Sequence, residues 1–196
     1  MTAGRLAPKT KRALQGIQRR LERYYGLERA PNVARFAQAA GKGERETLLV
    51  RESETAVELA LVVPTEPPRV GANDTWLQLA EGVSHFVYVV ERVRTGLPTT
   101  QLELELQAEV DKFVLLSLEP GFDRETAHRL HARLFEGGTF LDPSGTEAGE
   151  RYRLANDLAA RLVARLMHRD HHDAHSMLRR FYRAGQTDKI ALARAA

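Results

Sequence analysis

Residues 102–117 of the chain are LELELQAEVDKFVLLS, and their secondary structure sets the class of the protein. Polar and apolar residues alternate over residues 102–110, which also suits a half-buried strand. That segment holds one β-branched residue, Val110, and is otherwise dense in Leu, Glu, Gln and Ala, which favour helices. Thr100 and Glu103 form a capping box, the sequence signature of a helix start. We therefore predict a helix.

Drawn as a helix, residues 102–117 are apolar on two sides. One side carries Leu102, Leu106, Val110 and Phe113, and the nearly opposite side carries Leu104, Ala108 and Leu115. Between these sides runs a polar stripe of Glu105, Glu109 and Lys112. A helix with two apolar sides is typical of the interior of a bundle. We expect this segment to be the central helix.

The rest of the chain shows further helical periodicity and one clear β signal. Apolar residues recur at helical spacing near residues 8–25, 76–95, 124–136, 147–168 and 173–184, with a short last turn from Asp188. Two runs, 47–50 and 56–63, flank a polar stretch and predict a hairpin. Residues 32–40 predict a short helix or loop, and residues 64–74 a proline-rich linker. We predict a mainly α fold, a single-domain helical bundle over residues 1–196 with six or seven helices and one β-hairpin (about 46–63) inserted after the first helices.

The composition is that of a folded chain without thiol chemistry. Of the 196 residues, 43% are hydrophobic and 28% charged, which argues against wholesale disorder. There is no cysteine, so disulfides and thiolate metal sites are excluded. No stretch is long and apolar enough for a membrane span, and the basic first residues lack the apolar core of a signal peptide. We expect a cytoplasmic protein with no membrane insertion.

Charge is distributed unevenly along the chain. Residues 1–23 carry seven Lys and Arg against one Glu, and residues 165–196 carry seven against three Asp. Because the whole chain has a net charge of +3, the middle is acidic. Two interpretations remain open. The basic ends pack on the acidic middle, or they form a shared surface for phosphate, nucleic acid or an acidic partner.

The seven histidines fall mostly into two groups. Neutral imidazoles three or four residues apart on a helix can hold a divalent transition metal. The candidate metal ligands are His128, His131, His168, His172 and His175. No complete metalloenzyme motif accompanies them, and the alternative is a solvated, partly protonated basic segment.

Residues 169–175, RDHHDAH, resemble the Arg–x(4–6)–His motif of the HEPN-type all-helical ribonucleases. In that family the pair lies near the start of a late helix and usually acts across a dimer interface. The resemblance implies that Arg169 would hold the phosphate and that His175 would assist attack by the 2′-hydroxyl. The resemblance covers seven residues. The minimal helical bundle of that family does not include a β-hairpin such as the one predicted for this chain.

Glu105 and Glu109 are candidates for a catalytic acid. Carboxylates held between two apolar sides need a cation such as Lys112, or their pKa rises. An ion-pair network is the alternative interpretation. A second polar row, Glu81, His85, Tyr88 and Arg92, lies opposite the apolar stripe of its helix and is expected to face water.

The segment 179–183, RRFYR, interleaves arginines with aromatic residues. On single-stranded nucleic acid, rings stack on bases while guanidinium groups contact phosphates. The candidate nucleic-acid-binding residues are Arg19, Arg20, Arg23, Arg179, Arg180 and Arg183. In the alternative interpretation, Phe181 lies in the buried apolar stripe of an amphipathic helix and the arginines lie on its solvent-exposed side.

The function predicted from these patterns is non-enzymatic. The chain has no phosphate-binding glycine loop, dinucleotide fingerprint or serine-hydrolase elbow, and no cofactor is expected. We predict a binding or regulatory protein that acts through helical and basic surfaces, with a protein partner or self-association. The alternatives are a nucleic-acid-binding protein, including a metal-independent ribonuclease using Arg169 and His175, and a metal-dependent enzyme using the histidine clusters.

Overall fold

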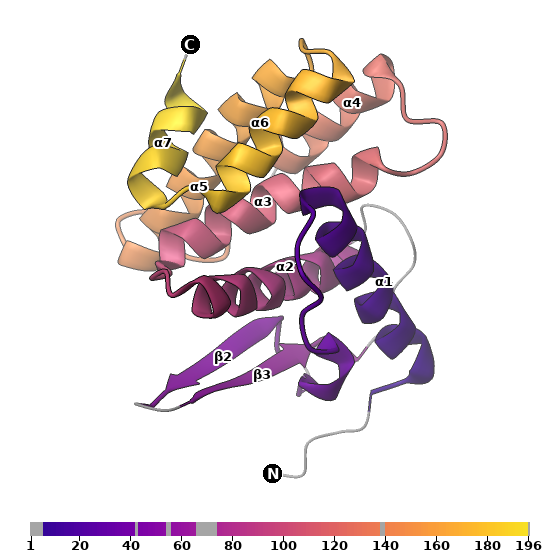
Figure 1. Cartoon of the computed structure of the whole chain (residues 1–196), viewed down its shortest axis with the longest axis vertical. Coiled ribbons are helices and arrows are strands. Elements are labelled where there is room, and N and C mark those ends of the chain that lie inside the picture. Colours follow the sequence, from indigo (N-terminus) through magenta and orange to yellow (C-terminus); the bar gives the residue numbers. More distant parts are fainter. Residues whose placement is uncertain (1–5, 42, 54–55, 66–73, 138–139, 196) are drawn as a thin grey trace. The chain divides into compact units, whose positions relative to one another are not determined.

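The computed structural model describes residues 6–41, 43–53, 56–65, 74–137 and 140–195. Over these residues the chain forms seven α-helices and a small three-stranded sheet (Figure 1). The mainly α class with one hairpin is therefore confirmed. Contacts within the chain divide it into two compact units, Met1–Pro98 and Thr99–Ala196. Most of the predicted proline-rich linker, residues 66–73, lies outside the described residues.

The first unit begins with α1 (Pro8–Tyr25), whose predicted bounds are confirmed. Its buried apolar side chains, Leu14, Ile17, Leu21 and Tyr25, recur at helical spacing. Gly26 ends the helix with a φ of 63°, a left-handed conformation that glycine adopts without strain. A 3₁₀ turn, η1 (Val33–Arg35), follows, and α2 (Asp74–Thr95) completes the helices of this unit.

The sheet of the first unit has the strand order β1-β3-β2. Strands β2 (Thr47–Glu52) and β3 (Val57–Val63) pair antiparallel as the predicted hairpin, with Leu48 opposite Leu61. Strand β1 (Ala37–Ala39) pairs parallel with β3. Residues 32–40 were expected to be a helix or a loop. The expectation misses β1 because three residues are too few to show a period of two.

The sheet approaches α2 closely at Gly82. A Cβ atom at this position would lie 2.7 Å from Leu61 Cδ1 and 2.8 Å from Glu46 Cγ. Glu46 itself lies with its Oε1 3.6 Å from the Nδ1 of His85, one turn further along α2. A glycine is therefore needed where the hairpin packs on the helix.

The polar row of α2, formed by Glu81, His85, Tyr88 and Arg92, was predicted to face water, and this prediction is wrong. His85, Tyr88 and Arg92 are buried. They enter the interior with partners of their own, because Glu46 faces His85, and Arg92 donates to the Tyr88 hydroxyl and stacks over its ring. These three side chains are therefore part of the protein interior and do not face solvent.

We predict that Gly82→Ala destabilises the protein by about 1–3 kcal/mol, because the new methyl overpacks a filled contact. Gly16→Ala on α1 is the matched control, since a Cβ there meets nothing within 4 Å. That control should be neutral or stabilising by up to about 1 kcal/mol through helix propensity. Urea denaturation of the two variants measures the difference, and equal midpoints would contradict the close approach.

All the secondary-structure elements of the second unit's described residues are helices. The unit contains α3 (Gln101–Ser117), α4 (Arg124–His131), the π-helical turn η2 (Ala132–Glu136), α5 (Glu147–Leu166), α6 (His171–Arg183) and α7 (Gln186–Arg194). The capping box of Thr100 and Glu103 is present, which confirms the helix over residues 102–117. Helix α3 is buried around most of its circumference and packs extensively on α5. Its two apolar sides are both used.

Helix α5 begins at Glu147 as expected. Its N-cap is Thr146, which accepts from Gly149 N. Thr146 also donates to the Pro143 carbonyl, in the turn at residues 143–146 that precedes the helix.

A helix that spans a bilayer must be both long and strongly apolar. None of the described helices meets both requirements.

Candidate binding groove

The last two described helices, α6 and α7, lie side by side in the second unit (Figure 1). Helix α6 is amphipathic, and Leu178, Phe181 and Tyr182 are its buried residues. Arg180 and Arg183 project from the other side and are exposed, whereas Arg179, at the boundary, is half-buried. The periodicity of α6 therefore directs three arginines away from the core.

A groove of about 960 Å³ runs between the two helices. Its lining residues are Ser176, Arg179, Arg180, Arg183 and Ala184 on the α6 side and Asp188, Ala191, Leu192 and Ala195 on the α7 side. One wall thus carries arginines and the other is mainly apolar. Three of the six predicted nucleic-acid-binding arginines meet here, which makes this groove the candidate functional site.

The charges of the groove favour an anionic ligand. Among the described residues of the lining there are three guanidinium groups and one side-chain carboxylate, that of Asp188. Arginine keeps its charge at every physiological pH, and its planar donors match a carboxylate or a phosphate.

The apolar wall is fixed by an arginine from α5. Arg165 donates to the main-chain carbonyls of Leu192, in the last turn of α7, and of Ala195, the C-cap residue of that helix. A cation at this end also complements the helix dipole. Burial, and then the charge of Arg169, lower the pKa of Arg165 from its ordinary value. The guanidinium group stays protonated, because arginine titrates far above neutral pH.

A buried lysine holds the other end of α7. Lys189 is fully buried, and its Nζ donates to Gln107 Oε1 on α3. The amide of Gln107 in turn donates to Asp111 Oδ1 at 2.8 Å. The Lys189 Nζ also lies 4.1 Å from the centroid of the Phe181 ring. Lysine, amide and carboxylate form one buried polar chain that joins α7 to α3, and the ring adds a cation–π contact from α6.

We predict that Lys189→Met lowers the free energy of unfolding by about 3 kcal/mol, because it leaves the buried Gln107 and Asp111 without their cation. The exposed Lys9 gives the matched control, and Lys9→Met should change stability by less than about 0.5 kcal/mol. Chemical denaturation measures both. Equal stabilities of the two variants would show that the buried chain does not anchor α7.

The aromatic residues of the segment 179–183 do not line the groove. Phe181 and Tyr182 are 0% and 2% exposed and pack in the second unit. Base stacking by these two rings, the basis of the nucleic-acid interpretation, is therefore not available in this arrangement. The other predicted nucleic-acid-binding residues, Arg19, Arg20 and Arg23, lie on α1 in the first unit.

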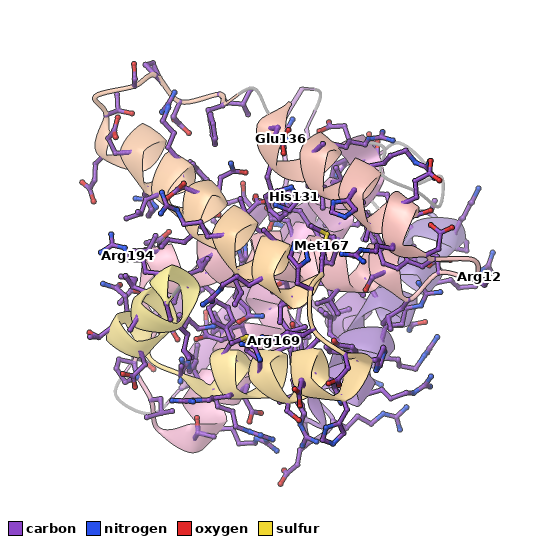
Figure 2. All side chains as sticks on the ribbon, turned by 90° about the horizontal axis from the view of Figure 1, so that it is seen from above. Arg12, His131, Glu136, Met167, Arg169 and Arg194 are labelled. Atoms are coloured by element: carbon purple, nitrogen blue, oxygen red, sulfur yellow. The ribbon has the colours of Figure 1, made fainter. Side chains whose placement is uncertain are left out.

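The predicted metal ligands are dispersed. His131 contacts the Ala160 carbonyl through Nε2 at 3.0 Å and faces Glu136 through Nδ1 at 3.4 Å (Figure 2). Both of its ring nitrogens therefore have protein partners. His128 and His168 do meet, with ring centroids 6.4 Å apart, but the Nδ1 of His168 faces the Arg124 guanidinium at 3.4 Å and must accept from it.

The remaining two predicted metal ligands lie on α6. His172 is highly exposed and faces Asp173 at 3.9 Å, while His175 lies in the second turn of the helix and is half-buried. Asp170, His172 and Asp173 bring ligand atoms within 4.8 Å of one another, all exposed. The Asp170 carboxylate already accepts from Asp173 N as the N-cap of α6. The five predicted histidines are thus not brought together as one ligand set.

The predicted catalytic residues lie at separate places. Arg169 is exposed in the turn before α6 (Figure 2), and His175 follows in that helix. On α3, Glu109 pairs with Lys112 at 2.8 Å, the cation expected from the sequence, and Glu105 is buried. The predicted ion pair for Glu109 is therefore present. Catalytic roles for these residues stay predictions.

The groove also contains residues that the sequence interpretation missed. Residues 186–194 were expected to form only a short turn, so the apolar wall from Ala191 to Ala195 and the anchors Arg165 and Lys189 were not anticipated. The sequence did contain one signal for this helix. Lys189, Leu192 and Ala193 recur at helical spacing, so that a lysine lies in an otherwise apolar row.

The cap of α6 gives a pH-dependent prediction. Hydrogen bonds from the main chain, first that of Asp173 N, lower the pKa of Asp170, and the same arrangement with Thr126 lowers the pKa of Asp123 on α4. Because the folded pKa is lowered, each cap stabilises its helix above the unfolded pKa, and this contribution is lost as pH falls through the folded pKa.

We therefore expect an NMR titration to give Asp170 and Asp123 carboxyl pKa values below those of unstructured aspartate. Asp170→Asn keeps a capping oxygen and should remove the acid-induced loss of order at the start of α6. A carboxyl pKa of Asp170 at or above its ordinary value would contradict the capping geometry.

Comparison with known proteins gives no further guide to function. No protein-family model, no curated protein and no solved structure matches this chain. The function is therefore inferred from the groove itself, from its charges and from the helices that hold it.

Proposed function

We propose that this protein is a non-enzymatic binding protein that docks an acidic, amphipathic segment of a partner protein in the groove between α6 and α7. The observation that carries the proposal is the pairing of an arginine wall, Arg179, Arg180 and Arg183, with an apolar wall that includes Leu192. An acidic helix with one apolar side complements both walls at once.

Charge complementarity supports an acidic occupant. Among the described lining residues the three arginines outnumber the carboxylate of Asp188, so a cationic partner would be repelled. The apolar wall supports a protein occupant, because leucine and alanine side chains stabilise a bound peptide by burying its apolar residues. A free phosphate would use the arginines alone and leave this wall exposed to water.

Two observations favour a protein partner over single-stranded nucleic acid and over catalysis. The rings of Phe181 and Tyr182, which would stack on bases, are buried. The described residues of the lining are three arginines, one serine, one aspartate and apolar residues, and they do not include histidine, the side chain that most often serves as general acid or base. Binding is therefore the activity that the groove supports best.

The test uses two fluorescent probes, a helical peptide with glutamates on one face and leucines on the other, and a single-stranded RNA of similar charge. The triple variant Arg179→Ala, Arg180→Ala, Arg183→Ala should weaken peptide binding by about tenfold or more, which corresponds to about 1.4 kcal/mol. Fluorescence anisotropy at several salt concentrations measures both affinities, and the peptide affinity should fall as salt screens the contacts.

The matched control is Arg19→Ala, Arg20→Ala, Arg23→Ala, which removes the same charge from α1. It should change the peptide affinity by less than about twofold, because the charges it removes are outside the groove lining. Equal losses in both triple variants would overturn the proposed site. Tighter binding of the RNA than of the peptide, with a steep salt dependence, would favour the nucleic-acid alternative instead.

The apolar wall has its own test. Leu192→Ser should weaken the amphipathic peptide by about fivefold, through the loss of roughly 1 kcal/mol of apolar contact. The same variant should leave the binding of polyglutamate unchanged, because polyglutamate engages only the arginines. Loss of both probes would mean that Leu192 supports the fold rather than the ligand.

A further inference from the structure

Strand β2 is an edge of the sheet in the first unit. Among the described residues the strand order is β1-β3-β2, so one side of β2 pairs with β3 and the other is unpaired within the sheet. The strand has six residues, TLLVRE, without proline or glycine. Edge strands of this kind present main-chain N–H and C=O groups to another strand.

Strand β2 also exposes aliphatic side chains. Leu49 is 52% exposed and Val50 is 42% exposed. Pairing with β3 places Leu49 opposite Ala60 and Val50 opposite Leu59, so the two side chains lie on opposite faces of the sheet. The usual guard against edge pairing is a charged residue, and Arg51, the charged residue next to Val50, already pairs with Glu58 on β3.

We propose that β2 pairs antiparallel with β2 of a second copy of this chain, about a two-fold axis that passes through Leu49. In an antiparallel pair related by such an axis, opposed residues share a face of the sheet, so the axis must pass through a residue position. Centring on Leu49 places Leu49 opposite itself, Leu48 opposite Val50, and Thr47 opposite Arg51.

This register is selected by the sequence of the strand. Centring on Val50 would place Leu49 opposite Arg51 and Leu48 opposite the charged residue Glu52. Centring on Leu48 would place Val50 opposite Glu46, a residue that is turned toward His85 on α2. Only the axis at Leu49 sets every aliphatic residue of β2 against another aliphatic residue, which is the cross-strand pairing that stabilises a sheet.

The second copy suits this edge better than an unrelated strand because the complement of β2 is its own sequence. The strand β1 at the opposite edge has three residues and offers too short a ladder for the same purpose. A six-residue ladder buries less surface than a permanent dimer needs, so we expect weak, concentration-dependent association.

Sedimentation equilibrium of the full chain over a wide concentration range tests the proposal. The wild type should pass from monomer to dimer. Leu49→Lys places a charge opposite its own copy and should weaken dimerisation by about tenfold or more. The matched control Leu97→Lys changes an exposed leucine outside the strand and should leave the dimer unchanged. A monomer at all concentrations, or a dimer insensitive to Leu49→Lys, would overturn the proposal.

The absence of cysteine allows a second, independent readout. Leu49→Cys should form a symmetric intermolecular disulfide under mild oxidation, because directly opposed residues of an antiparallel pair have Cα separations that a disulfide can bridge. Arg51→Cys and Leu97→Cys should not, since neither opposes its own copy in this register. Cross-linking of all three variants at similar rates would overturn the register, and circular dichroism would verify that each variant is folded.

Discussion

Lys189 is a lysine with no access to water, and the candidate groove depends on it. Removing an ammonium group from water costs several kcal/mol unless hydrogen bonds and an opposite charge compensate. Here the compensating interactions are hydrogen bonds, which depend on orientation. Lys189 donates to the amide oxygen of Gln107, and that amide donates to the Asp111 carboxylate. Helix α7 can therefore occupy few positions on α3, and the apolar wall that α7 contributes to the groove is held with it.

The ends of α7 are fixed by different interactions. The first turns are fixed by the buried lysine, and carbonyls at the C-terminal end are fixed by the guanidinium group of Arg165. Both anchors are cations that lie behind the wall, whereas the cations of α6 line the groove. The amphipathic pattern of α6 explains this separation, since the same period that buries Phe181 directs Arg180 and Arg183 outward.

Sequence periodicity predicts long elements well and short ones poorly. The bounds of α1, the capping box at Thr100 and the hairpin follow from local patterns that need no tertiary information. The burial of His85 could not be predicted, because it depends on a partner from elsewhere in the unit, Glu46 on the sheet side. For the site, sequence patterns identified the three arginines of α6. They predicted only a short turn where α7 forms the opposite wall. The apolar row of α7 contains a lysine, so it is recognised as the buried side of a helix only when that lysine is known to be buried.

The groove and the β2 edge belong to different units and rest on different forces. The groove attracts its ligand through guanidinium charges, and salt screens such contacts over about 10 Å or less. The β2 edge offers main-chain hydrogen bonds and aliphatic pairs, and salt affects these interactions little. Raising the ionic strength should therefore weaken the binding of an acidic peptide while leaving dimerisation almost unchanged. If both declined in parallel, electrostatic attraction would have to be common to the two surfaces, and the assignment of β2 to strand pairing would be wrong.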